Sequence, residues 1–182
     1  MADHITLKGN DGLTFHALSE GDGPLVLCLH GFPDCPHTFA PQMQAIANAG
    51  FRAVAPWMRG YHPDTIPEDQ CYQTAALAKD MISLIDALEY DTAILYGHDW
   101  GTATANLATV LNAQRVTKLI TSAVPYGSAL TEAFLHNGDQ QRRSWYIFLR
   151  GEIKFVYRRV FVRPSSSQFS QEREELGLFS SQ

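Results

Sequence analysis

Few cysteines, no long apolar run and no excess of positive charge set the first limits on this sequence. Three cysteines in 182 residues, without Cys-x-x-Cys spacing, argue against a disulfide framework or a zinc site and indicate reduced thiols. No apolar run approaches the roughly 20 residues of a membrane span, and the N-terminus has no apolar signal region. A net charge of −5 disfavours nucleic acid as a partner. We therefore expect a cytoplasmic protein that binds neither membrane nor nucleic acid.

Apolar segments of strand length alternate with segments of helical periodicity. The run from Pro24 to Leu29 is continuously apolar, as expected for a strand buried on both faces. Between residues 73 and 89, apolar residues recur at helical intervals and form one stripe. This alternation predicts an α/β fold with a mostly parallel sheet and helices on both faces. We expect strands at 4–8, 13–18, 24–29, 51–57, 92–97 and 116–124, a turn at 10–12, and helices at 37–48, 73–89 and 100–114.

The most informative motif is Gly-x-Asp-x-Gly at Gly97, Asp99 and Gly101. It follows a short apolar run and precedes an Ala-rich, helix-like segment. This order is the setting of a nucleophile elbow, where glycines permit a sharp turn and close helix–strand packing. A free carboxylate is already ionised near neutral pH, and it can displace a leaving group at an sp³ carbon to form an ester. We therefore expect Asp99 to be a catalytic nucleophile acting on epoxides or alkyl halides.

A second motif, His30-Gly31-Phe32-Pro33, follows the apolar run that ends at Leu29. In hydrolases of this plan, the loop after such a strand supplies one backbone N–H of an oxyanion hole. The residue after the nucleophile supplies the other. On this sequence the donors would be the backbone N–H groups of Phe32 and Trp100. They would stabilise the oxyanion that forms when water attacks an Asp99 ester.

These two motifs resemble the α/β-hydrolase fold, and within it the epoxide hydrolases and the related haloalkane dehalogenases. Weaker correspondences lie at 59–61, 123–125 and 143–148, so that the resemblance covers roughly residues 20 to 148. It implies that residues 1–130 are the N-terminal part of a hydrolase core and residues 131–182 the start of a cap with an atypical tail. We expect structural roles for His30, Gly31, Pro33, Gly97, His98 and Gly101, and pocket-lining roles for Trp145 and Tyr146.

Phe32 bears on the choice between the two kinds of enzyme. Many haloalkane dehalogenases have an Asn after the His-Gly pair as a halide donor, and the side chain of Phe32 has no donor. The resemblance therefore favours an epoxide hydrolase that forms an alkyl-enzyme ester on Asp99 and releases a diol. The alternative is a haloalkane dehalogenase with Trp100 as halide donor, and a fluoroacetate-type dehalogenase ranks third. The resemblance implies no cofactor and no metal, a small-molecule partner that is an epoxide or alkyl halide, and leaves a homo-oligomer open.

The resemblance also implies a histidine that activates water and an acid that orients it, both after the nucleophile in the chain. Only His136 follows Asp99, and it stands just before the expected start of the cap. Glu132 is a weak candidate for the acid. We therefore expect a truncated core, with the C-terminal part missing and the sheet ending at its sixth strand with an uncovered edge. A further interpretation is that the chain is a catalytically inert truncated fragment.

Overall fold

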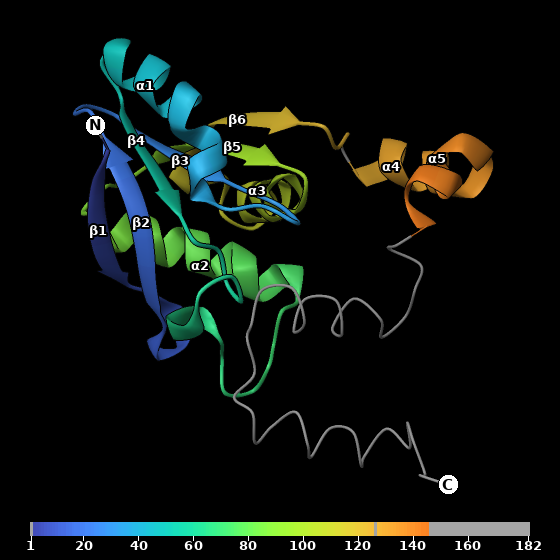
Figure 1. Ribbon diagram of the computed structural model, residues 1–182, viewed down its shortest axis with the longest axis horizontal. Coiled ribbons are helices and arrows are strands. Elements are labelled where there is room, and N and C mark those ends of the chain that lie inside the picture. The colour runs from blue at the N-terminus through green and yellow to red at the C-terminus, as the bar shows by residue number, and fades with distance from the viewer. Residues whose placement is uncertain (1, 126, 146–182) are drawn as a thin grey trace, which may run out of the picture. The chain divides into compact units, whose positions relative to one another are not determined.

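A six-stranded sheet organises the part of the chain that the computed structural model describes, residues 2–125 and 127–145. The strand order is β1-β2-β4-β3-β5-β6 (Figure 1). The strands are β1 (Asp3–Lys8), β2 (Thr14–Glu20), β3 (Leu25–Leu29), β4 (Arg52–Pro56), β5 (Ala93–His98) and β6 (Val116–Ser122). The α-helices are α1 (Ala40–Asn48), α2 (Thr74–Ala87), α3 (Trp100–Leu111), α4 (Gly127–His136) and α5 (Gly138–Arg143). The short 3-10 helices are η1 (Asn10–Gly12), η2 (Pro36–Phe39), η3 (Pro63–Thr65) and η4 (Ala113–Arg115).

The sheet is mixed but mostly parallel, which confirms the expected fold class. β4, β3, β5 and β6 pair in parallel, whereas β1 with β2 and β2 with β4 pair antiparallel. The turn between β1 and β2 lies at the predicted residues, where Asp11 (φ 54°) and Gly12 (φ 72°) both adopt the left-handed conformation. Glycine and aspartate tolerate this region better than most residues, so the sequence specifies the turn locally.

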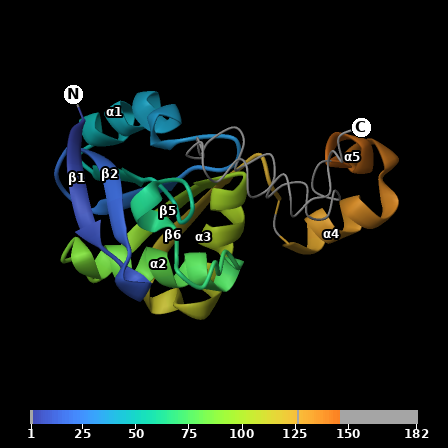
Figure 2. The ribbon, with the colours of Figure 1, turned by 60° about the horizontal axis from the view of Figure 1, so that its bottom comes forward.

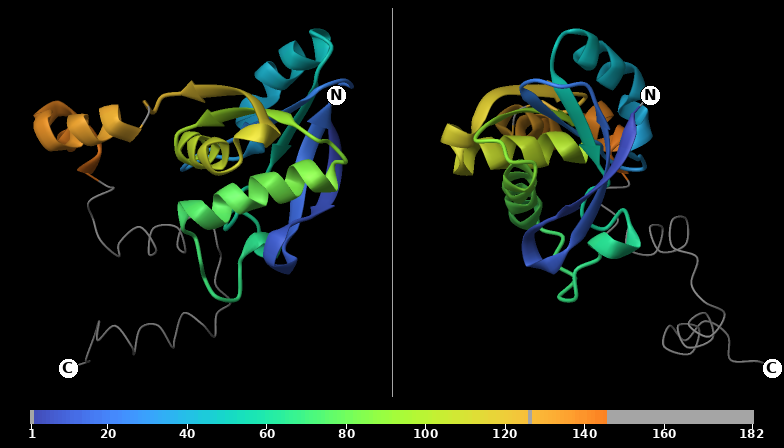
Figure 3. Two further views of the ribbon diagram at one scale, coloured as in Figure 1. Left: turned by 180° about the vertical axis from the view of Figure 1, so that it is seen from behind. Right: turned by 90° about the vertical axis from the view of Figure 1, so that its left-hand side faces the viewer.

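Helices cover both faces of the sheet, as the alternation of elements predicts. Leu77, Met81 and Leu84 of α2 pack with Ala105 of α3 into the larger apolar cluster on one face. Phe39 and the α1 residue Met43 contribute to a second cluster. Figure 2 shows α1 on one side of the strands and α2 and α3 on the other, and Figure 3 shows the same layers from two further directions.

The central strands bring the two sequence motifs to one edge of the sheet. β3 is buried at all five positions, as its continuous apolar run predicts. β3 and β5 are parallel neighbours with Leu29 opposite Gly97. Because the two strands end side by side, the residues that follow them, His30 to Phe32 and Asp99, meet at the carboxyl edge. In open α/β sheets this is the edge where ligands bind.

β6 is the last strand in the sheet order, and apolar side chains near it are exposed. Val110 and Leu111 at the end of α3 are 63% and 56% exposed, and Ile120 of β6 is 46% exposed. An uncovered edge with apolar neighbours was expected from the sequence, and such an edge favours association with another strand.

The chain divides into two units, Met1–Leu130 and Thr131–Gln182. In the described part of the second, Asn137 is the N-cap of α5, and its side chain accepts hydrogen bonds from the backbone N–H groups of Asp139 and Gln140. Asparagine is a favoured residue at this position because its side chain satisfies free backbone donors. Tyr146 and the tail to residue 182 lie outside the described residues. Among those that are described, no helix combines the length and apolar character needed to cross a membrane.

Candidate active site

Asp99 occupies a sharp turn between β5 and α3. Its backbone has φ 53° and ψ −120°, outside both the helical and the extended regions. A non-glycine residue with such angles costs free energy and persists only when its surroundings enforce it. Here α3 begins directly afterwards, and the N–H of Thr102 donates to the Asp99 carbonyl at 2.9 Å. The backbone therefore has the strained strand–turn–helix geometry that the motif predicts.

The two glycines of the motif let α3 approach the sheet. A Cβ on Gly101 would overlap the backbone carbonyl of Leu29 in β3, and a Cβ on Gly97 would lie 2.5 Å from the carbonyl oxygen of Gly101. Both contacts involve backbone atoms, which have little freedom to move aside. Any larger residue would push the helix away and move Asp99 with it.

Thr102 stabilises the turn, and the sequence analysis missed it. Its buried hydroxyl lies 2.8 Å from the carbonyl oxygen of Gly97 and 3.2 Å from that of Ser122. It thus joins the first turn of α3 to the ends of β5 and β6. A threonine at a buried helical position needs a polar partner, and this requirement was the available signal.

The Asp99 carboxylate meets the loop after β3. The backbone N–H of Phe32 donates to Oδ1 of Asp99 at 2.8 Å. A Cβ on Gly31 would overlap the Asp99 side chain, so that only glycine permits this contact. Trp100 opens α3, and the N-terminus of a helix favours a nearby negative charge by about 0.3–1 kcal/mol. Its side chain is 44% exposed.

His30 connects the loop after β3 to the segment after β4. Its ring is fully buried; Nε2 accepts a hydrogen bond from the N–H of Met58 at 3.2 Å, and Nδ1 lies 3.1 Å from the carbonyl of Gly31. The two partners fix the neutral tautomer that carries its proton on Nδ1. Burial lowers the pKa of His30 and outweighs the opposing effects of the Gly31 hydrogen bond and the Asp34 charge. With both nitrogens bound, the ring holds the loop in place.

His98 and Asp34 lie beside the turn. Nδ1 of His98 is buried without a hydrogen-bond partner, and Oδ2 of Asp34 lies 4.0 Å from it. Asp34 follows the cis Phe32–Pro33 peptide, and its Oδ1 accepts from the N–H of Cys35. The sequence analysis passed over Asp34, although a carboxylate directly after the motif loop was visible.

The remaining candidates belong to the second unit. Trp145 is 61% exposed, and its pocket-lining role stays a prediction together with that of Tyr146. Glu132, the weak candidate for an acid, lies on α4 with an oxygen 3.8 Å from Nε2 of His136. Both side chains are largely exposed, as in an ordinary surface pair one helical turn apart.

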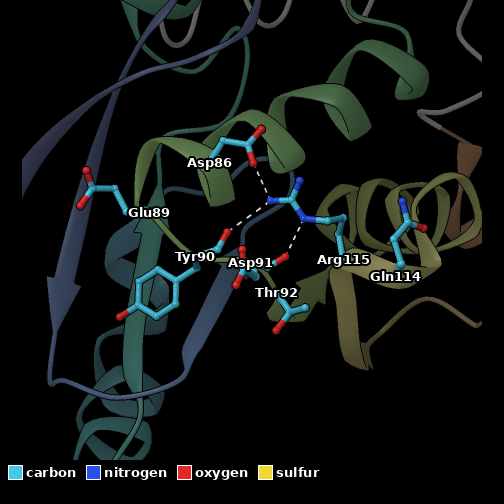
Figure 4. A pocket seen from close by; sticks show the side chains of 7 residues that line it. All are labelled: Asp86, Glu89, Tyr90, Asp91, Thr92, Gln114 and Arg115. Atoms are coloured by element: carbon cyan, nitrogen blue, oxygen red, sulfur yellow. Dashed lines mark hydrogen bonds and ion pairs between the residues drawn. The ribbon is translucent and has the colours of Figure 1, made fainter.

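A surface pocket of about 600 Å³ lies at the amino end of β5, away from Asp99 at its carboxyl end. Figure 4 shows the guanidinium of Arg115 bridging the Asp86 carboxylate and the backbone carbonyls of Tyr90 and Asp91. These bonds join the end of α2 to η4. Arg115 is the cation among the lining residues and is already paired, so the pocket is a structural junction.

Comparison with known families identifies the family of this chain. The family model described as alpha/beta hydrolase fold matches residues 24–163. The chain belongs to the α/β hydrolase fold family. It is an epoxide hydrolase-like member, because the epoxide hydrolase of Caballeronia sordidicola is 38% identical over 143 residues. Epoxide hydrolase 3 of Xenopus tropicalis is 35% identical over 149 residues.

Solved structures of this family show the same fold. An epoxide hydrolase from an endophytic Streptomyces has 35% identity and a TM-score of 0.66 over 69% of this chain. One from Vigna radiata has 32% identity and a TM-score of 0.65 over 69% of this chain. The chain spans about two fifths of these relatives: 43% and 40% of the two curated proteins, 38% and 39% of the two structures. The expected family and fold are thus confirmed.

Proposed function

We propose that Asp99 is the nucleophile of an epoxide-opening hydrolase and that this chain carries the first half of its reaction. The hydrogen bond from the N–H of Phe32 to Oδ1 of Asp99 is the observation that carries the proposal. It leaves Oδ2 as the oxygen that attacks an epoxide carbon. The C–O bond of the epoxide then breaks, and its oxygen takes up a proton as the ester forms.

The second half-reaction uses the same donor. Water attacks the carbonyl carbon of the Asp99 ester, and negative charge develops on Oδ1, which already faces the N–H of Phe32. We assign the second donor to the backbone N–H of Trp100 at the start of α3. One such donor contributes about 2.7–4 kcal/mol to transition-state stabilisation in a related arrangement. Collapse of the oxyanion releases the diol and restores the carboxylate.

An epoxide is favoured as substrate over an alkyl halide. The relatives above are epoxide hydrolases, and the side chain of Phe32 offers no halide donor. Trp100 keeps the alternative of a haloalkane dehalogenase open, because its indole N–H is a donor on an exposed side chain.

Water activation distinguishes a complete reaction from a single turnover. A general base needs a nitrogen within reach of the water and free to accept its proton. In the described structure, both nitrogens of His30 are engaged, His136 pairs with Glu132 on α4, and Nδ1 of His98 is buried from solvent. We therefore expect this chain to form an ester on Asp99 that is hydrolysed slowly.

Intact mass and diol release, recorded together on the full chain with a reactive aryl epoxide, test the proposal. We expect a mass increase of one substrate, mapped to Asp99 by peptide analysis and absent from Asp99→Asn. Asp91→Asn is the matched control, because this exposed carboxylate precedes β5 at the opposite edge of the sheet. No adduct in a folded protein, or an adduct that persists in Asp99→Asn, would refute the nucleophile. An adduct formed faster from an alkyl chloride than from the epoxide would favour the dehalogenase.

A further inference from the structure

His16, His62 and Asp64 form a compact cluster of nitrogen and oxygen ligand atoms that does not include Asp99. Nε2 of His16 lies 2.8 Å from Oδ2 of Asp64, and Nδ1 of His62 lies 3.8 Å from the same oxygen. One potential ligand atom from each residue lies within 4.8 Å of the other two. The rings of His16 and His62 are 4.2 Å apart between centroids, with their planes tilted by 44°.

The backbone that carries these side chains is firmly held. His16 lies on β2, and its carbonyl accepts a hydrogen bond from the N–H of Trp57 at 2.9 Å. His62 and Asp64 lie at the start of η3, where the buried hydroxyl of Thr65 accepts from the N–H of His62 and lies 3.2 Å from the carbonyl of Met58. Two segments 48 residues apart in the sequence therefore meet at a fixed distance. Such support is what a metal site needs to hold its ligands in place.

The cluster is also open to solvent. The side chains of His16, His62 and Asp64 are 34%, 32% and 53% exposed, so an ion can reach the cluster from solvent. Lys8 also acts on Asp64 through its positive charge, and this charge opposes a cation to some extent.

We propose that His16, His62 and Asp64 bind a divalent transition metal ion of the Zn²⁺ type through two imidazole nitrogens and one carboxylate oxygen. Ligands at about 2.0–2.2 Å from a tetrahedral Zn²⁺ are about 3.4 Å from one another, between the 2.8 and 3.8 Å observed here. Small side-chain rotations complete the geometry, with water as the fourth ligand. Mixed nitrogen and oxygen donors suit Zn²⁺, Co²⁺ or Cu²⁺ better than Mg²⁺, which prefers oxygen alone.

Binding would replace two existing hydrogen bonds. The ion takes the place of the proton between His16 and Asp64, and coordination through Nδ1 of His62 displaces the 3.2 Å hydrogen bond from the N–H of Asp64. That N–H lies in an exposed residue, where water can replace the lost acceptor. The ion would join β2 to the segment after β4, whose Met58 N–H holds His30. Its role is thus to stabilise the fold near the oxyanion loop, separate from the proposed chemistry at Asp99.

Isothermal titration of the full chain with Zn²⁺ tests the proposal. We expect one saturable site, a melting temperature that rises with Zn²⁺ concentration, and no comparable effect of Mg²⁺. His16→Gln and His62→Asn remove an imidazole, and asparagine keeps an acceptor at the start of η3. Each should weaken Zn²⁺ binding by more than the roughly 10- to 100-fold that loss of a supporting partner costs.

Two controls separate this site from other ligands. His4→Ala removes an exposed histidine outside the cluster, and Cys35→Ser removes the thiol that lies 3.8 Å from His37. Both variants should keep wild-type affinity. Co²⁺ should quench Trp57, whose ring centroid is 6.4 Å from that of His62, in wild type and not in His16→Gln. Absence of a saturable site, unchanged binding in His16→Gln, or loss of binding in Cys35→Ser would overturn the proposal.

Discussion

Replacing Asp80 by alanine should lower the free energy of unfolding by about 3–5 kcal/mol, because the change isolates a buried positive charge. The Arg59 and Asp80 side chains are both 0% exposed. Nε and Nη2 of Arg59 donate to the two carboxylate oxygens of Asp80 at 2.7 and 2.6 Å. This paired arrangement joins the segment after β4, which also carries His62, to α2.

The magnitude follows from the contacts that are lost. Hydrogen bonds to charged groups contribute about 1.5–3 kcal/mol each, so two of them agree with the range for a broken buried pair. The hydrogen bond to Asp80 raises the pKa of Arg59, and the guanidinium therefore stays charged. The partners that remain are the carbonyl of Cys71 at 3.5 Å and Asp11 at 2.8 Å, whose side chain is 50% exposed. An exposed partner of this kind contributes about 0–1 kcal/mol and does not compensate.

Urea unfolding of the variants provides the assay, with the slope of the transition checked for two-state behaviour. Asp86→Ala is the matched control, because Asp86 is also on α2 and pairs with Arg115, but its side chain is 60% exposed. It should cost less than about 1 kcal/mol. Exchanging both partners, in Arg59→Met with Asp80→Leu, should restore stability to near or above wild type. Equal losses in Asp80→Ala and Asp86→Ala would refute the reasoning.

Three further predictions concern the turn and its supporting loop. Thr102→Val should lower the free energy of unfolding by about 1–3 kcal/mol, since it removes the buried hydroxyl that donates to the carbonyl of Gly97. Thr109→Val, on the same helix and only partly buried, is the control in urea unfolding. Gly31→Ala should slow adduct formation by about 100-fold or more by displacing the Asp99 carboxylate, and an unchanged rate by mass spectrometry would contradict this. His30 has a pKa lowered from 6.5, so the unfolded chain binds more protons than the folded one below that pH. The contribution of His30 to the free energy of unfolding should therefore be fully present above pH 6.5 and fall at lower pH, by up to about 1.4 kcal/mol per pH unit, down to the lowered pKa. An NMR titration of the ring with its midpoint at or above 6.5 would disprove this.

Local patterns were sufficient to predict most of the fold. The continuous apolar run of β3, the helical stripe of α2 and the glycines around Asp99 each specify a local conformation, and all three match the structure. The paired glycines were especially informative, because a close helix–strand approach excludes every larger residue. Strand order and the antiparallel attachment of β2 to β4 depend on contacts between distant segments, which periodicity does not encode.

Pairs of polar residues were harder to predict. Asp80 lies on the otherwise apolar face of α2, and a carboxylate at a buried position requires a cationic partner. The sequence could have indicated that need, but it did not identify Arg59, which is 21 residues away. The cluster of His16, His62 and Asp64 was missed for the same reason, because His16 is 48 residues away from Asp64 in the sequence.

The two halves of the proposed reaction require different residues. Attack on an epoxide requires a carboxylate oxygen held in place, and the N–H of Phe32 donates to Oδ1 of Asp99 at 2.8 Å. Hydrolysis additionally requires an imidazole with a free nitrogen, whereas His30 uses both of its nitrogens to hold the loop. His98 is the histidine next to Asp99, and its Nδ1 is buried 4.0 Å from Asp34. Because this nitrogen is buried from water, we expect a long-lived Asp99 ester, and its lifetime would measure how much of the second half-reaction the chain can perform.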